Sequence, residues 1–160
     1  MTKPNYTFRV IEIVKVVDGD TAHLRLDLGL QETHLKDIRL LGWDTPEINS
    51  GSEKEKAAGA AATKVAYAFL HAAIAHPKRT VWVQTKKDSQ SFNRYLGDIW
   101  VEDPSGGKTY LGEHLENLGL AVKSPNGDVK WRDIHDKETA GSSVTGPEPK
   151  ATNHRQQITP

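Results

Sequence analysis

Residues 7–30 of the chain read TFRVIEIVKVVDGDTAHLRLDLGL. The first part of this stretch, residues 7–17, is rich in β-branched side chains, which is typical of a β-strand. Asp18-Gly19-Asp20 interrupts the pattern, because an Asp-Gly pair favours a tight turn between two strands. From residue 21 to residue 30 leucines alternate with polar side chains, which predicts a second, half-buried strand. The stretch therefore predicts a β-hairpin that carries two carboxylates in its turn.

The rest of the sequence predicts three more strands and three helices. The strands are expected at residues 36–42, 80–85 and 95–102, and the helices at residues 53–76, 110–118 and 129–139. Five short strands around one core, with a long alanine-rich helix after the third, suit a Greek-key barrel. The expected fold class is therefore α+β, a five-stranded OB-fold β-barrel with three α-helices. We expect this domain to span residues 1–139.

Composition excludes several classes of protein. The chain has 160 residues, which suits one domain, and it has no cysteine, which excludes disulfides, zinc fingers and a cysteine nucleophile. Lysine plus arginine and aspartate plus glutamate are equal at 21, so wholesale electrostatic binding of DNA is not expected. Gly, Ser, Pro, Thr and Gln dominate residues 140–160, which predicts a disordered tail.

The sequence shows neither a secretory signal nor an apolar run of the ~18 residues that a membrane span needs. We therefore expect a cytoplasmic protein without a membrane partner, and a viral or phage origin stays open.

Two acidic clusters carry the chemistry that the sequence suggests. The first is Asp18-Gly19-Asp20-Thr21, and the second is Asp44-Thr45-Pro46-Glu47. If the first three strands form a meander, both clusters can lie at the same end of the sheet. Carboxylates so close together repel one another unless a cation neutralises them. Oxygen ligands favour a hard cation, Ca²⁺ or Mg²⁺, over zinc.

Two arginines, Arg39 and Arg94, accompany the acids, and each offers a fork that matches two phosphate oxygens. A cation, an unliganded carboxylate and two arginines are the parts needed to hydrolyse a phosphodiester. Residues 78–95 hold four more positive than negative charges, so Lys86 and Lys87 are candidates for binding a polyanionic substrate.

Each motif alone also has a simpler structural interpretation. An Asp-Gly-Asp sequence is common in hairpin turns. Asp44-Thr45-Pro46-Glu47 could begin a helix, with Thr45 as the cap and Pro46 at the first helical position. The lysines could belong to a solvated loop.

The combination of motifs resembles the staphylococcal nuclease (thermonuclease) family. The resemblance rests on VVDGDT at 16–21, IRLLGWDTPE at 38–47, Arg94 and EHLENLGLA at 113–121, and it covers about residues 8–135. It implies an OB-fold barrel with three helices and calcium-dependent hydrolysis of DNA and RNA. It further implies little sequence specificity, products with 3′-phosphates, a preference for single strands, and a monomer.

The resemblance also implies a role for each matching residue. Asp20 and Asp44 would bind one Ca²⁺ through their side chains and Thr45 through its backbone carbonyl, with Asp18 just behind these ligands. Glu47 would activate or position the attacking water, and Arg39 and Arg94 would clamp the scissile phosphate.

Two departures from the family pattern concern the substrate. Asn93 stands where the family has a glycine, and the aspartate of that motif is displaced to Asp88. Residues 122–127 contain no tyrosine, so either base stacking is absent or Trp131 or Phe92 supplies it. An alternative therefore stays open, a non-catalytic OB-fold module that binds nucleic acid or acts as a scaffold.

Overall fold

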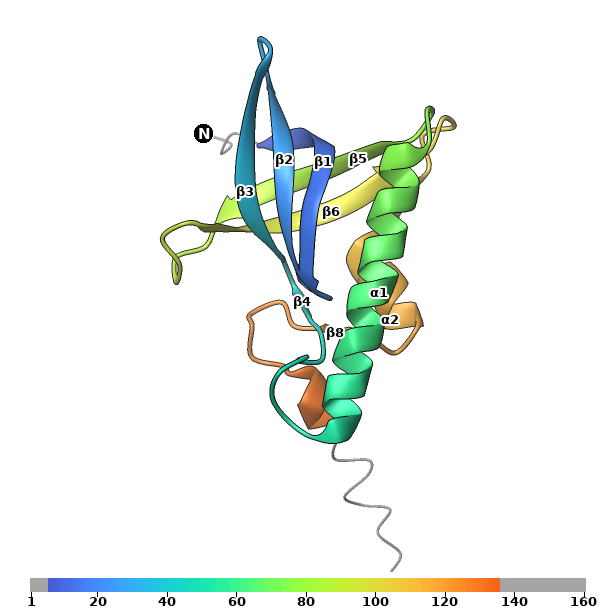
Figure 1. Cartoon of the computed structure of the whole chain (residues 1–160). Helices are drawn as coiled ribbons and strands as arrows, with labels where there is room; N and C mark the ends of the chain where they lie inside the picture. Colours follow the sequence, from blue (N-terminus) through green and yellow to red (C-terminus); the bar gives the residue numbers. More distant parts are fainter. Residues whose placement is uncertain (1–5, 136–160) are drawn as a thin grey trace, which may run out of the picture.

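A closed barrel forms the centre of the protein. The structure is a computed structural model, and it describes residues 6–135. The barrel strands are β1 (Thr7–Asp18), β2 (Thr21–Gly29), β3 (Glu32–Leu40), β5 (Thr80–Lys87) and β6 (Arg94–Glu102). Neighbours pair antiparallel in the order β3-β2-β1-β5-β6, and a parallel pairing of β3 with β6 closes the barrel (Figure 1). This architecture confirms the expected OB-fold-like barrel with three helices.

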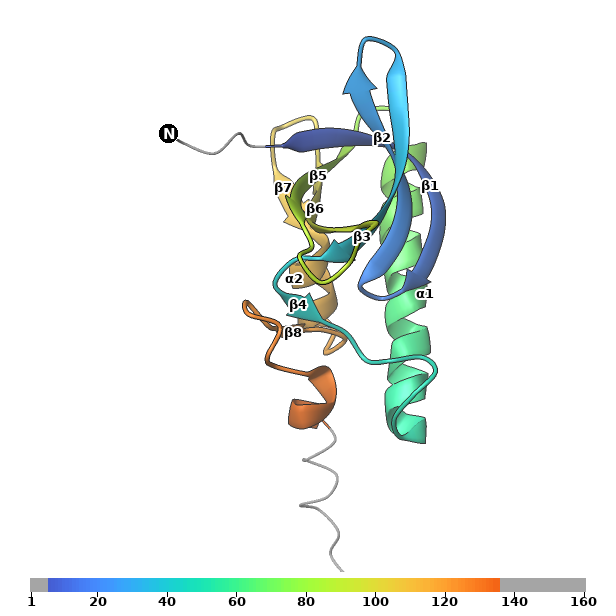
Figure 2. The same cartoon turned by 90° about the vertical axis from the view of Figure 1, so that its left-hand side faces the viewer.

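The helices cover the barrel as the sequence predicts. Helix α1 (Glu53–Ala75) runs along one side of it, and α2 (Leu111–Asn117) follows β6 and β7 (Lys108–Tyr110) (Figure 2). Small buried side chains on α1, such as Ala62 and Ala66, let the helix approach the strands closely. Gly119 adopts a φ of 73° after α2, as expected for a residue that ends a helix.

Helix α1 is long and apolar enough to cross a membrane, with a mean hydropathy of 1.2 over 18 residues. The sequence did not predict this, because Thr63, Lys64 and His71 interrupt the apolar run at residues 57–75. A helix packed on a protein core passes the same test, so the observation is weak evidence for a membrane span.

Two short strands build a second small sheet below the barrel. Strand β4 (Trp43–Asp44) pairs antiparallel with β8 (Val122–Lys123), and the N–H of Ser124 donates to the carbonyl of Gly42 at 2.8 Å. This pairing brings the segment after α2 against the second acidic cluster.

Most boundaries of the expected elements differ from the structure by one or two residues; for example, β5 ends at Lys87 and not at residue 85, and β3 ends at Leu40 and not at residue 42. Strand β3 begins at Glu32 and not at residue 36, because the β2–β3 hairpin projects beyond the barrel, where residues 32–35 are exposed and show no alternation. Of the last expected helix, residues 131–135 are helical. Residues 136–139 and the expected disordered tail lie outside the described residues.

Candidate functional site

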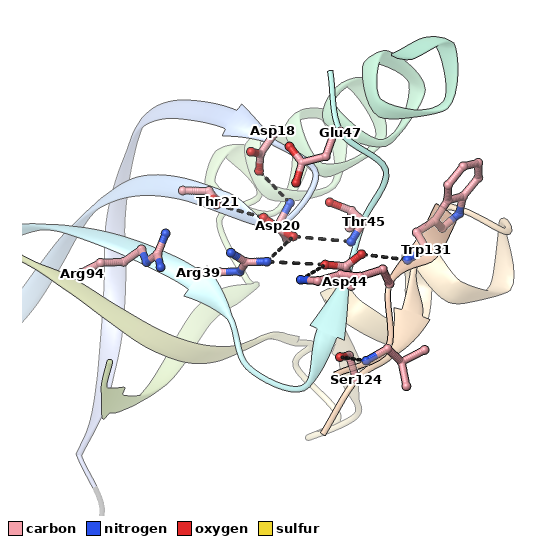
Figure 3. Close-up of polar contacts among 12 residues, drawn as sticks. Asp18, Asp20, Thr21, Arg39, Asp44, Thr45, Glu47, Arg94, Ser124 and Trp131 are labelled. Atoms are coloured by element: carbon pink, nitrogen blue, oxygen red, sulfur yellow. Dashed lines mark hydrogen bonds and ion pairs between the residues drawn. The ribbon is translucent and has the colours of Figure 1, made fainter. Parts of the chain in front are cut away.

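The two acidic clusters meet at one end of the barrel. Thr21 pairs with Arg39 across β2 and β3, and the N–H of Leu40 donates to the carbonyl of Asp20 at 2.8 Å. The chain then turns, and the N–H of Thr45 approaches Asp20 Oδ2 at 3.4 Å (Figure 3). The meander thus places Asp20, Asp44 and Thr45 together, although Asp20 and Thr45 are 25 residues apart in sequence.

Both central carboxylates are buried and face the same guanidinium. Asp20 and Asp44 are only 7% and 5% exposed. Arg39 Nη2 lies 3.6 Å from Asp20 Oδ2 and 3.5 Å from Asp44 Oδ1, so a single nitrogen bridges the two acids. The carboxylates therefore converge on one position that favours positive charge.

This donor set fits a hard divalent cation. Such ions take carboxylate, main-chain carbonyl and water oxygens. Within residues 6–135 there is no group of three or more His, Cys, Asp or Glu side chains that could hold a metal. A cation at this position would therefore depend on the two carboxylates together with main-chain and water oxygens, and the carbonyl of Thr45 is the expected main-chain ligand.

Asp18 lies directly behind Asp20. Its Oδ1 accepts the N–H of Asp20 at 3.1 Å. Burial, and then the neighbouring Asp20 carboxylate, raise the pKa of Asp18 to about 6. A divalent cation beside Asp20 would offset this repulsion, because an opposite charge favours the ionised form of both acids.

Glu47 and Arg94 lie on different sides of Asp20. Figure 3 shows the exposed Glu47 beside Asp18, whereas Arg94 lies beyond Arg39 at the start of β6. Arg94 Nε donates to Asp88 Oδ2 at 2.9 Å, and among residues 6–135 its two terminal NH₂ groups make no hydrogen bond. The N–H of Gln90 and the guanidinium of Arg94 hold the pKa of Asp88 below its usual value.

A polar cleft of about 400 Å³ lies between Arg39, Asp44 and Arg94. Its lining includes residues from β3, β4, the end of β5 and the loop after it, β6 and the segment after β8: Arg39, Asp44, Lys86, Asp88, Arg94, Ser124 and Lys130. Arg39 and Arg94 thus face one cleft with Asp44, while Glu47 does not line it.

The two candidate substrate lysines differ. Lys86 lines the cleft. The Lys87 ammonium donates to the carbonyls of Ser91, Phe92 and Arg94 at 2.6, 2.9 and 3.3 Å. Lys87 therefore holds the loop at residues 88–93, which positions the start of β6 and Arg94.

The two candidates for base stacking also differ. Trp131 is only 3% exposed, and its indole N–H donates to the carbonyl of Gly119 at 2.9 Å, so its ring belongs to the interior. Phe92 is 92% exposed in the loop before β6. Of the two aromatic side chains, only Phe92 is accessible to a base.

The sequence motifs predicted neither Lys130 nor Glu55 as neighbours of the site, and they predicted Trp131 for base stacking and not as a partner of Asp44. Lys130 Nζ lies 3.2 Å from Asp44 Oδ1, and the N–H of Trp131 donates to Asp44 Oδ2 at 2.8 Å. Glu55 Oε1 accepts the N–H of Glu47 at 3.3 Å. The spacing of Ser52 and Glu55 is that of a capping box, which could have drawn attention to Glu55. No local pattern marks Lys130, which is 86 residues from Asp44.

No protein-family model and no curated protein sequence matches this chain.

Proposed function

We propose that this protein is a calcium-dependent nuclease that hydrolyses phosphodiester bonds of single-stranded DNA and RNA with little sequence specificity and leaves 3′-phosphates. The observation that carries the proposal is the convergence of two buried carboxylates, Asp20 and Asp44, on Arg39. Asp44 and Arg39 line one cleft together with Arg94, and Asp20 lies behind that cleft wall. Buried acids in this arrangement need a counter-charge, and the cleft beside them offers guanidinium groups to a phosphate.

Each residue has a distinct task in this proposal. Asp20, Asp44 and the carbonyl of Thr45 would hold the cation, which when bound stabilises negative charge on the phosphate oxygens. Arg39 and Arg94 bind the non-bridging oxygens and keep the phosphate in the cleft. Glu47, exposed next to Asp18, orients a water molecule and accepts its proton. Lys86 contacts the flanking backbone phosphates.

The direct test is degradation of a single-stranded DNA oligonucleotide and an RNA of the same sequence in millimolar calcium, with a chelator control. We expect degradation only with calcium, and mass spectrometry should find 3′-phosphates. Asp20→Asn and Asp44→Asn should each abolish the degradation. Asp27→Asn on β2 is the control and should leave the degradation unchanged, because Asp27 pairs with Arg9 and is no part of the proposed site. Degradation that survives the chelator, or that both site variants retain, would contradict the proposal.

Glu47→Gln tests the role of the base. We expect kcat to fall by about 10²- to 10⁴-fold, because the variant cannot accept a proton from water. The affinity for calcium and the melting temperature should stay unchanged, since the side chain is exposed and is not an expected ligand. The matched control is Glu53→Gln, whose side chain is 91% exposed in the first turn of α1. Turnover at the wild-type rate would refute the assignment of Glu47.

A second candidate function is favoured by a groove at the mouth of the barrel, with a volume of about 590 Å³. Its lining combines aromatic, aliphatic and basic side chains without a carboxylate: Tyr6, Phe8, Leu26, Leu28, His34, Lys36, Ile38, Thr85, Lys87 and Tyr95. Aromatic rings beside cations suit a single-stranded nucleic acid, whose bases stack while its phosphates attract the cations. The protein would then be a binding module without turnover.

Fluorescence anisotropy in chelator distinguishes the two functions. If the protein is a binding module, it should bind a labelled oligonucleotide in chelator. Tyr6→Ala and Lys36→Glu should then weaken this affinity more than the control Lys15→Glu, which changes an exposed residue on β1. Binding without any degradation in calcium would favour the module, and calcium-dependent degradation would favour the nuclease.

A further inference from the structure

Glu55 is a buried carboxylate that the proposed reaction does not use directly. It is only 1% exposed in the first turn of α1, where its N–H donates to the side chain of the N-cap Ser52 at 3.1 Å. Its Oε1 accepts the N–H of Glu47 at 3.3 Å. Glu55 therefore connects the start of α1 to the loop that carries Glu47.

The loop also packs tightly against α1 at two glycines. A Cβ atom on Gly59 would come within 2.7 Å of the carbonyl carbon and oxygen of Glu47. A Cβ atom on Gly51 would lie 1.9 Å from Glu55 Oε2, and Gly51 has a φ of 87°. The main chain of Glu47 thus rests directly on the helix, with the Glu55 carboxylate enclosed between them.

A positive charge from the other end of the described chain pairs with this carboxylate. Arg132 Nε lies 3.3 Å from Glu55 Oε1. A buried carboxylate without a partner is strongly unfavourable, and Arg132 supplies the partner for the same oxygen that accepts the N–H of Glu47. The two preceding residues, Lys130 and Trp131, contact Asp44. One short segment, residues 130–132, therefore reaches the carboxylate of Asp44 and, through Glu55, the main chain of Glu47.

We infer that Glu55 is a positioning residue, which fixes the peptide of Glu47 and so the direction in which that carboxylate meets the attacking water. The inference rests on the proposed function, because it is catalysis that requires an oriented Glu47. Among residues 6–135, Glu55 makes no hydrogen bond or ion pair with Asp20 or Asp44, and it does not line the cleft that holds Arg39 and Arg94. Loss of its acceptor oxygen should therefore lower kcat and leave calcium affinity and KM almost unchanged.

The test compares Glu55→Ala, Glu55→Gln and the exposed control Glu53→Gln. Glu55→Gln keeps an oxygen that can accept the N–H of Glu47, whereas Glu55→Ala removes it. We expect kcat to fall by about 10²-fold in Glu55→Ala, since a small misplacement of a reacting group has effects of that size. Glu55→Gln should restore most of that loss, and Glu53→Gln should match the wild type. If Glu55→Ala does not fold, Glu55→Asp replaces it: the shorter side chain moves the carboxylate oxygen away from the N–H of Glu47 and keeps a negative charge near Arg132.

Amide hydrogen exchange of Glu47, measured by NMR without metal or substrate, gives a readout that does not depend on activity. We expect this N–H to be protected in the wild type and in Glu55→Gln, and to exchange at least tenfold faster in Glu55→Ala or Glu55→Asp. Unchanged exchange and unchanged kcat in those two variants would overturn the inference while the nuclease proposal stands. An inactive wild type would remove the nuclease proposal, and the exchange rates would still decide whether Glu55 holds the loop.

Discussion

Arg39 contacts both central carboxylates, so at the scale of single residues it has two tasks. Its guanidinium lies beside Asp20 and, together with the Lys130 ammonium, beside Asp44, and with substrate we expect the same guanidinium to bind the phosphate. Arg39→Lys should therefore be nearly as damaging to kcat as Arg39→Ala, about 10²-fold or more, because lysine keeps the charge and loses the fork. Steady-state kinetics on the oligonucleotide substrate checks this. A lysine variant that retains most of the activity would count against two-point contact with phosphate.

Short sequence motifs predicted some of the residues of the site and not others. The acids and arginines were found because they stand close together in two short stretches, residues 16–21 and 38–47, or at the start of a strand. The partners Lys130 and Trp131 meet Asp44 only through the folding of distant segments, and a main-chain N–H leaves no mark in a sequence. The hydrogen bonds from the Lys87 ammonium to the carbonyls of Ser91 and Phe92 could not be predicted either, because main-chain carbonyls are present at every residue.

At the scale of elements, the loop between β5 and β6 determines where Arg94 lies. Lys87 and Asp88 hold this loop from its first residues, and Lys86 faces the cleft. Lys87→Met should therefore lower kcat by misplacing Arg94 and should speed amide exchange in residues 88–93. Lys86→Met should mainly raise KM, because it removes only a contact with substrate. Steady-state kinetics and amide hydrogen exchange on the two variants measure this difference. If both variants raised KM equally and left kcat unchanged, the proposed role of Lys87 in placing Arg94 would be contradicted.

The elements that the sequence predicted are those with a clear period. Alternation marked β2 and the inner half of β3, β-branched side chains marked β1, and helical spacing marked α1. The first four residues of β3 were not predicted because residues 32–35 are all exposed, so no alternation of burial exists there. Strands β4 and β8 have two residues each, too few to show any period, and their pairing depends on the barrel that brings them together.

At the scale of the whole molecule, the pH dependence of stability has one clear contribution outside the site. Burial, and then the Glu113 carboxylate, raise the pKa of Asp98 above its ordinary value of 3.8. The folded state therefore binds this proton more tightly than the unfolded chain, and ionisation destabilises the fold as the pH rises through the raised pKa.

Asp98→Asn should remove that effect. We expect it to raise the melting temperature at about pH 7.5 and to have almost no effect at about pH 3, where both states are protonated. Thermal unfolding at the two pH values measures the difference. Glu113→Gln should give a smaller gain in the same direction, since it removes the lesser cause. An equal gain at both pH values would show that the charge of Asp98 is not responsible.

The arrangement of the whole chain is what makes the site. The order of strands and the position of the long helix indicated an OB-fold barrel, and the parallel pairing of β3 with β6 closes it beside the cleft. The β1–β2 turn and β4 then face each other, so that Asp20 and Asp44 converge on Arg39.

Isothermal titration of the metal-free protein with calcium tests this claim most directly. We expect the wild type to bind one ion, and Asp20→Asn and Asp44→Asn each to weaken binding by at least about tenfold, which corresponds to about 1.4 kcal/mol. Asp27→Asn should bind as the wild type does. A wild type that takes up no calcium, or two site variants that bind it as tightly as the wild type, would contradict a shared cation between Asp20 and Asp44.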